Sequence, residues 1–286
     1  MRTSHSVLLV LAGLILFCPR GNAQAKIATS PIPQNDPWMN TSLDPDTRAD
    51  LVIHAMSLDE KIQLVHGAGG VGYVLSGATL PPGHNLGAGY VSGIPRLHLP
   101  DINLADSALG VRMGSLQSRY STLLPSVLGM GASWDTSIAY LYGSVIGREL
   151  RDQGYNMSIG GGINLIREPR NGRNFEYSSE DPILAGVMVG ELVRGLQSNH
   201  IMGDLKHYAL NDQETDRDTL NAVLDPRALR ETDLLAFQIA IGIAQPAGVM
   251  CSYNRVNSDY ACENDYLLNQ TLKVSVRSVP LARSRG

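Results

Sequence analysis

From about residue 99 onward, short apolar runs alternate with segments that have the period of an amphipathic helix. Four runs have the length and residue types of strands: "LPDINLAD", "YNMSIGGGINLI", "IMGDLKHYAL" and "PAGVMCSYN". Four segments have helical spacing: "WDTSIAYLYGSVIGRELRDQG", "DPILAGVMVGELVRGLQSN", "DPRALRETDLLAFQIAIGIA" and "NDYLLNQTLK". Strands that alternate with helices predict a parallel sheet covered by helices.

Two α/β architectures fit this alternation, the (β/α)8 TIM-type barrel and the doubly wound sheet, and periodicity alone does not separate them. Roughly 260 residues in one domain favour the barrel. No G-x-G-x-x-G follows the first predicted strand, which weakens the dinucleotide-binding form of the doubly wound sheet.

The N-terminal residues show a different pattern. Residues 1–25 predict a secretory signal peptide, because Arg2 precedes an apolar run over 7–17 that is short for a membrane span, and a small-x-small site ends at Ala25. The alternative is an uncleaved membrane anchor. Residues 26–45, rich in Pro, Ser, Thr and Asn, predict an irregular lead-in.

Two helices are expected after the lead-in. Asp46 and Thr47 are candidate caps of the first, and Ser57 with Glu60 forms a capping-box pattern at the start of the second. The glycine- and proline-rich residues 67–93 predict a long loop.

Composition and charge narrow the range of functions. The 286 residues are 43% hydrophobic and 17% charged, with a formal net charge of −4, which is typical of a globular chain without broad attraction to nucleic acid or an anionic membrane. Once the signal is removed, Cys251 and Cys262 are the remaining cysteines. In an exported chain they favour a structural disulfide over a metal pair, because no His or Cys lies around them at ligand spacing.

Polar side chains gather where the predicted strands end, which is where a (β/α)8 barrel carries its active site. These residues are Asp106, Arg112, Arg167, Glu168, Arg170, Arg173, Glu176, Glu180, Lys206, His207, Asp212, Glu214, Asp216, Tyr253, Asn254 and Arg255. Lys206 is the most distinctive, because an ammonium group in an apolar strand is costly unless it is paired. Any one of them is equally consistent with an ion pair that holds a loop, and His207 alone with a core histidine. Together they suit an uncharged, polyhydroxylated ligand.

Three stretches, "REPRNGRNFEYSSEDPILAG", "LKHYALNDQETDR" and "GVMCSYNRVNSDYACEN", resemble glycoside hydrolase family 3 in its branch of bacterial and fungal β-glucosidases. The likeness runs from about Asp46 to Lys273, with long motifs in the family's order and spacing. It implies a barrel domain over residues 46–273, a β-glucoside or cello-oligosaccharide substrate, and no metal or organic cofactor. The signal peptide implies an exported protein, periplasmic or secreted, that leaves the membrane after signal cleavage. The mildly negative net charge predicts that it has no nucleic-acid partner.

The resemblance also implies six substrate-binding residues: Asp106, Arg112, Arg173, Lys206, His207 and Tyr253. In the family, the residue matched by Asp106 holds two hydroxyls of the sugar. Ser107 stands where the family usually has Gly, and Asn171 where it usually has Trp. We therefore expect these two positions to be where the shape of the pocket can differ from that of the family. The segment "KHYALND" disfavours the N-acetylglucosaminidases of the family, whereas a β-xylosidase-type activity stays an alternative.

Family members are retaining glycosidases, which use one carboxylate as nucleophile and a second, about 5 Å away, as acid/base. The resemblance places the nucleophilic Asp near Ser284, but the chain reads "VSVRSVPLARSRG" there and has no Asp or Glu after Asp265. The family's acid/base Glu belongs to a second domain. We therefore expect a barrel that is incomplete at its C-terminus, no catalytic carboxylate and no hydrolysis by this polypeptide.

Residues 274–286 are then an aberrant basic tail. A shifted reading frame near codon 274 is the favoured explanation, because the match stops inside a motif, and a deliberately short, non-catalytic carbohydrate-binding protein is the alternative. Asp212, Glu214 and Asp216 are poor substitutes for the missing carboxylates, since their motif occupies a different position on the barrel.

Overall fold

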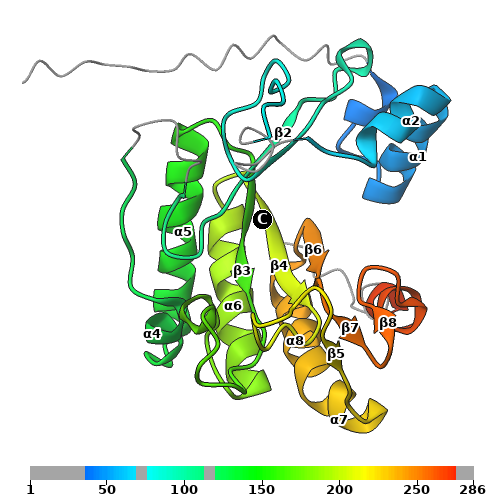
Figure 1. The fold of residues 1–286 in the computed structure, drawn as a ribbon. Helices are drawn as coiled ribbons and strands as arrows, with labels where there is room; N and C mark the ends of the chain where they lie inside the picture. Colours follow the sequence, from blue (N-terminus) through cyan, green and yellow to red (C-terminus); the bar gives the residue numbers. More distant parts are fainter. Residues whose placement is uncertain (1–35, 69–75, 113–119, 275–286) are drawn as a thin grey trace, which may run out of the picture.

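The computed structural model describes residues 36–68, 76–112 and 120–274. The predicted signal peptide and the predicted tail beyond residue 274 lie outside these ranges. The central feature is a five-stranded sheet in the order β1-β2-β3-β4-β6 (Figure 1). Its strands are β1 (Gly89–Val91), β2 (Ile102–Ala105), β3 (Met157–Gly162), β4 (Met202–Tyr208) and β6 (Gly248–Cys251).

From β2 to β6 the strands are parallel, whereas β1 runs antiparallel to β2. Helices α5 (Thr136–Asp152), α6 (Pro182–Gln197) and α8 (Asp233–Ala244) stand side by side along one face of the sheet (Figure 1). After β2, β3 and β4, the helices α5, α6 and α8 in turn lead to the next parallel strand. The predicted α/β fold is therefore confirmed as a TIM-barrel-like arrangement, of which the described strands form a curled part.

Helix α5 packs against α6 at very short range because glycines face the neighbouring backbone. A Cβ atom at Gly143 would overlap the carbonyl oxygen of Leu192, and one at Gly195 would overlap that of Tyr140. The helices begin where the sequence provides capping groups: Asp135 caps α5, and Asp181 followed by Pro182 starts α6.

The predicted capping box of Ser57 and Glu60 is confirmed at the start of α2 (Leu58–Leu64). The predicted caps of α1 (Pro45–Ala55), Asp46 and Thr47, were wrong. The cap is Asp44, two residues before Asp46, whose side chain accepts a hydrogen bond from the N–H of Thr47, because Pro45 occupies the first helical position. Both helices join the rest of the chain through polar contacts, such as the ion pair of 2.6 Å between Arg96 and Glu60.

Two further expectations need correction. The loop predicted over residues 67–93 contains β1, which is extended because it pairs with β2. The single helix expected over residues 225–244 is divided at Thr232 into α7 (Pro226–Glu231) and α8, where the backbone leaves the helical region.

Short elements complete the described fold: the helix α4 (Val127–Gly131), the 3-10 turns η1 (Pro37–Met39), η2 (Pro95–Leu97) and η3 (Asn174–Glu176), a small sheet of β5 (Asn221–Ala222), β7 (Arg255–Val256) and β8 (Asp259–Tyr260), and the π-helical η4 (Tyr266–Leu272). A disulfide joins Cys251, at the end of β6, to Cys262, with Cα atoms 5.2 Å apart. Among the described helices, none combines the length and the apolar character that a membrane crossing requires.

Candidate active site

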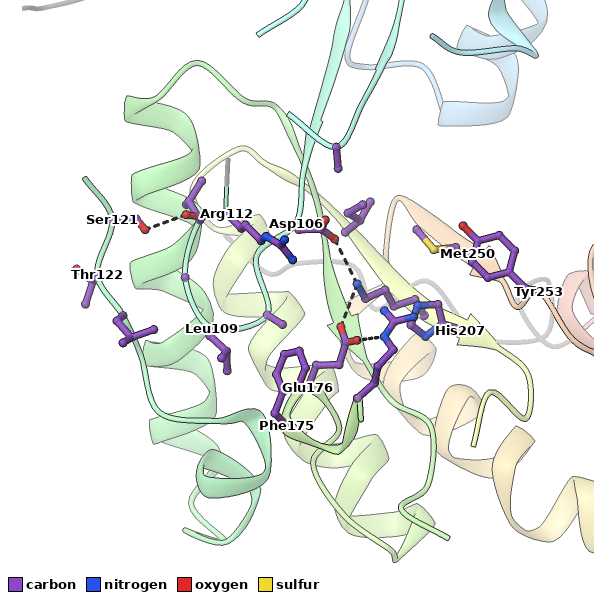
Figure 2. A pocket seen from close by; sticks show the side chains of 18 of the residues that line it. Asp106, Leu109, Arg112, Ser121, Thr122, Phe175, Glu176, His207, Met250 and Tyr253 are labelled. Carbon is purple, nitrogen blue, oxygen red and sulfur yellow. Dashed lines mark hydrogen bonds and ion pairs between the residues drawn. The ribbon is translucent and has the colours of Figure 1, made fainter. Parts of the chain in front are cut away.

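A cavity of about 890 Å³ lies at the carboxyl ends of β2, β3, β4 and β6 (Figure 2). The strands bring polar groups here because their carboxyl ends meet at the same edge of the sheet. The structure places all six of the predicted substrate-binding residues in the lining of this cavity: Asp106, Arg112, Arg173, Lys206, His207 and Tyr253.

Lys206 is the central charge of the cavity. Its side chain is only 3% exposed, and its ammonium Nζ lies 3.1 Å from Oε2 of Glu176 and 3.6 Å from Oδ1 of Asp106. Glu176 is buried as well, and its Oε1 accepts a hydrogen bond from Nε of Arg173. The buried cation is therefore paired, as the cost of burying an isolated ammonium group requires.

The charged contacts continue beyond Glu176. Nη1 of Arg173 lies 3.8 Å from Oε1 of Glu214, whose Oε2 accepts a hydrogen bond of 2.8 Å from Arg217. The guanidinium of Arg217 lies over the ring of Tyr253, 4.8 Å from its centroid. A continuous network of ion pairs and one cation–π contact therefore connects Lys206 to the ring of Tyr253 at the mouth of the cavity.

The backbone of His207 is held by two hydrogen bonds with Asn164, and its ring is buried. Its N–H donates to Oδ1 of Asn164 at 2.7 Å, and its carbonyl accepts from Nδ2 of Asn164 at 2.9 Å. The pKa of His207 falls to about 2, chiefly because the ring is buried and also because Arg173, Lys206 and Arg217 repel a positive charge. The imidazole is therefore neutral at physiological pH.

Arg112 and Asp106 are held together through the backbone, since the N–H of Arg112 donates to the carbonyl of Asp106 at 2.7 Å. Ser107, the residue at which the family pattern changes, is buried behind Asp106. Its hydroxyl lies 2.6 Å from that of Ser158 on β3. This contact joins the segment that carries Asp106 to the neighbouring strand.

Sequence reasoning did not select several residues of the cavity. Glu176 was one of many polar residues at strand ends, and only its position between two cations distinguishes it. Arg217 lies within the second family motif, which was the available signal. The apolar lining could not be recognised from the sequence, because such side chains look like core residues: Leu109, Leu123, Phe175 and Met250.

The carboxylates considered as substitutes do not lie in the cavity lining. Asp212 contacts Arg167, with 3.4 Å between Oδ2 and Nε, and its pKa rises to about 7 because it is buried and lies near Asp233, which outweighs the effect of Arg167. Glu214 pairs with arginines, and Asp216 is exposed. Of the described residues, the carboxylates that line the cavity are Asp106 and Glu176, and both contact Lys206.

A site with this composition can hold an uncharged molecule by many hydrogen bonds. Carboxylate oxygens offer acceptors, the ammonium and guanidinium groups offer donors, and an aromatic ring lies at the edge. Residues 95–276 match the model of the glycosyl hydrolase family 3 N terminal domain.

The chain belongs to glycoside hydrolase family 3. Beta-glucosidase 1 of Aspergillus aculeatus is 33% identical to it over an alignment of 268 residues, which covers 88% of this chain and 29% of that protein. Thermostable beta-glucosidase B of Acetivibrio thermocellus is 36% identical over an alignment of 188 residues, which covers 63% of this chain and 25% of that protein.

Solved structures of family 3 enzymes show the same fold. Beta-glucosidase 3B from Thermotoga neapolitana, in complex with alpha-D-glucose, superposes with a TM-score of 0.74 at 33% identity, over 79% of this chain and 32% of that one. DesR, a beta-glucosidase from Streptomyces venezuelae in complex with D-glucose, superposes with a TM-score of 0.71 at 36% identity, over 79% of this chain and 27% of that one. The chain therefore spans less than a third of the length of these two enzymes. The matches confirm the expected family and the TIM-barrel-like fold.

Proposed function

We propose that this chain supplies the sugar-binding side of the active site of a β-glucosidase-type hydrolase, whose full-length relatives release terminal non-reducing β-D-glucosyl residues. One observation carries the proposal: Asp106 and Lys206 meet, 3.6 Å apart, in a cavity that also receives the other residues matched to the family's sugar pocket. The side chain of Asp106 is 44% exposed, so its carboxylate keeps acceptor capacity for a ligand.

Each polar residue has a proposed role that follows from its contacts. Asp106 accepts hydrogen bonds from two sugar hydroxyls, and Lys206, which is held by Glu176, donates to a hydroxyl oxygen. Arg173 donates from its place directly before η3, and His207 donates from the end of β4. Tyr253, 57% exposed beneath Arg217, provides an aromatic surface at the mouth.

We propose a retaining mechanism for the full-length relatives and binding without hydrolysis for the polypeptide of residues 1–286. Retention requires two carboxyl groups about 5 Å apart, one of which is free to attack the anomeric carbon. Asp106 and Glu176 are instead engaged with Lys206, and no Asp or Glu follows Asp265. A non-catalytic carbohydrate-binding role for this polypeptide is consistent with the same observation.

We also propose that the chain is exported through its N-terminal signal, residues 1–25. The apolar run and the small-x-small site support this proposal. N-terminal sequencing of the protein from the extracytoplasmic fraction tests it: a mature chain that begins with Lys26 is expected, and a chain that keeps residues 1–25 contradicts it.

Calorimetric titration of the full chain with D-glucose and cellobiose tests the binding role. Asp106→Asn keeps the shape of the side chain and removes the charge, so we expect affinity to fall about 10- to 100-fold, the range for hydrogen bonds to a charged group. Asp218→Asn is the matched control, because Asp218 is 79% exposed and lies outside the cavity lining. Near-UV circular dichroism establishes that each variant is folded.

Three results bear on the alternatives. Equal affinity of wild-type protein and Asp106→Asn for glucose contradicts the proposed site. Tighter binding of D-xylose than of D-glucose favours the β-xylosidase-type alternative. Retaining hydrolysis of an aryl β-glucoside by the purified chain, abolished by Asp106→Asn or Glu176→Gln, contradicts binding without hydrolysis.

A further inference from the structure

Tyr177 lies behind His207, outside the lining of the cavity. Its side chain is fully buried, its hydroxyl lies 3.1 Å from Nδ1 of His207, and the two rings meet edge to face with centroids 6.1 Å apart. Asn211 contacts the same hydroxyl twice: its Nδ2 lies 3.0 Å away and its backbone carbonyl 3.4 Å away. The hydroxyl of Tyr177 thus connects the segment after β4 to the ring of a cavity residue.

The contacts of this hydroxyl limit its proton to two acceptors and favour one of them. The amide Nδ2 of Asn211 can only donate, so the oxygen of Tyr177 accepts that hydrogen bond. Its own proton can then go to Nδ1 of His207 or to the carbonyl of Asn211, and the contact to Nδ1 is 0.3 Å shorter (3.1 against 3.4 Å). Burial raises the pKa of Tyr177, so the hydroxyl keeps its proton and acts as a donor.

We propose that Tyr177 and Asn211 are positioning residues that hold His207 as the neutral tautomer with its proton on Nε2. Nδ1 accepts the hydrogen bond from Tyr177, so the ring presents an N–H donor at Nε2 to the cavity that it lines. Within the described residues, no protein group is hydrogen-bonded to Nε2. The charged groups around the ring are Arg173, Lys206 and Arg217, which oppose a second proton.

This inference rests on the proposed function and makes it more specific. The carboxylate of Asp106 can only accept hydrogen bonds, whereas His207 in this tautomer can only donate at its cavity side. The two residues therefore recognise opposite partners: a hydroxyl proton at Asp106 and a hydroxyl oxygen at His207. With the proton on Nδ1 instead, Asp106 and Nε2 of His207 would both be hydrogen-bond acceptors. A sugar hydroxyl oxygen would then lose one donor in the cavity.

Long-range ¹H–¹⁵N correlation spectra of the histidine rings test the tautomer directly, without any need for activity. The full chain contains 7 histidines, and the signals of His207 are those that disappear in His207→Gln. In wild-type protein we expect Nε2 to be protonated and Nδ1 to be bare. In Tyr177→Phe we expect a mixture of tautomers and a fall in D-glucose affinity of about three- to tenfold, the range for one neutral hydrogen bond.

Tyr208→Phe is the matched control, because Tyr208 is equally buried, lies beside His207 on β4, and donates to the carbonyl of Leu267 at 3.1 Å. It should leave the tautomer and the affinity unchanged. If Tyr177→Phe does not fold, Asn211→Ala provides the second variant, since it removes the amide that fixes the hydroxyl.

Two outcomes overturn the inference: a proton on Nδ1 in wild-type protein, in which case the hydroxyl proton of Tyr177 goes to the carbonyl of Asn211, or a tautomer that neither substitution changes. A fixed Nε2–H tautomer without any glucose binding supports the assignment of the proton and contradicts the proposed function, so the two failures are distinguishable.

Discussion

Glu176 is the shared partner of two cations, which makes Glu176→Gln an informative substitution. Lys206 and Glu176 are 3% and 4% exposed, and their charged atoms lie 3.1 Å apart. Arg173 donates to the other carboxylate oxygen. Glutamine keeps the size of the side chain but removes the negative charge. Lys206 then stays buried and Arg173 partly buried, with partners only at longer range, Asp106 at 3.6 Å and Glu214 at 3.8 Å.

Removal of one partner from a buried ion pair costs about 3–5 kcal/mol, because the other charge is left uncompensated. Asp106 and Glu214 offset part of this loss, so we expect the free energy of unfolding to fall by about 3 kcal/mol. That change is a factor of more than 100 in the folding equilibrium, at about 1.4 kcal/mol for each factor of ten. A fall of this size is well resolved by urea unfolding followed by far-UV circular dichroism.

Glu231→Gln is the matched control. Glu231 pairs with Arg227 at 2.8 Å, but the two side chains are 61% and 83% exposed, so we expect a change below about 1 kcal/mol. The double variant Glu176→Gln/Lys206→Gln should lose less than the sum of the two single changes, because no ammonium group is then left unpaired. A loss below about 1 kcal/mol for Glu176→Gln would refute the reasoning, since it would mean that water reaches these charges.

The remaining predictions concern a buried carboxyl and the helix contact. Burial raises the pKa of Asp204 to about 7, an effect that Lys206 only partly opposes. An unfolded Asp loses its proton near pH 4, so the folded state holds an extra proton between about pH 4 and 7, and the free energy of unfolding falls as pH rises through this range. In urea titrations, Asp204→Asn should remove the share of this pH dependence that Asp204 causes, and so raise stability at pH 8 relative to pH 5. Asp212, whose pKa is also raised to about 7, should continue to lower the free energy of unfolding as pH rises. The same pH dependence in Asp204→Asn as in wild-type protein would contradict the prediction. Gly143→Ala should destabilise the chain by about 1–3 kcal/mol or more, because its Cβ would overlap the backbone of α6. Gly242→Ala on α8, with open space around it, should instead stabilise by about 0.5–1 kcal/mol in the same thermal or urea unfolding assay; equal effects of the two substitutions would contradict the packing argument.

The sequence by itself determined the order of the main elements. Period and capping are local properties, so the alternation of apolar runs and helical segments was enough to predict β2, β3, β4 and β6 and the helices between them. The motifs were equally local, and they selected six residues that the fold places around one cavity.

Only the tertiary structure decided the features that depend on distant partners. The strand β1 has three residues in a stretch rich in glycine and proline, and it exists because β2 provides its hydrogen bonds. The break between α7 and α8 occurs at Thr232 beside Asp233, which is held by Arg167 from 66 positions earlier in the chain. No periodic pattern encodes such a contact.

The same reason limits what the sequence could say about the site. Glu176 meets Lys206, and Tyr177 meets His207, each across 30 positions in the chain. The sequence supplied the chemical groups, but their distances, and with them the pairing of Lys206 and the tautomer inferred for His207, follow from the way β3 and β4 lie side by side.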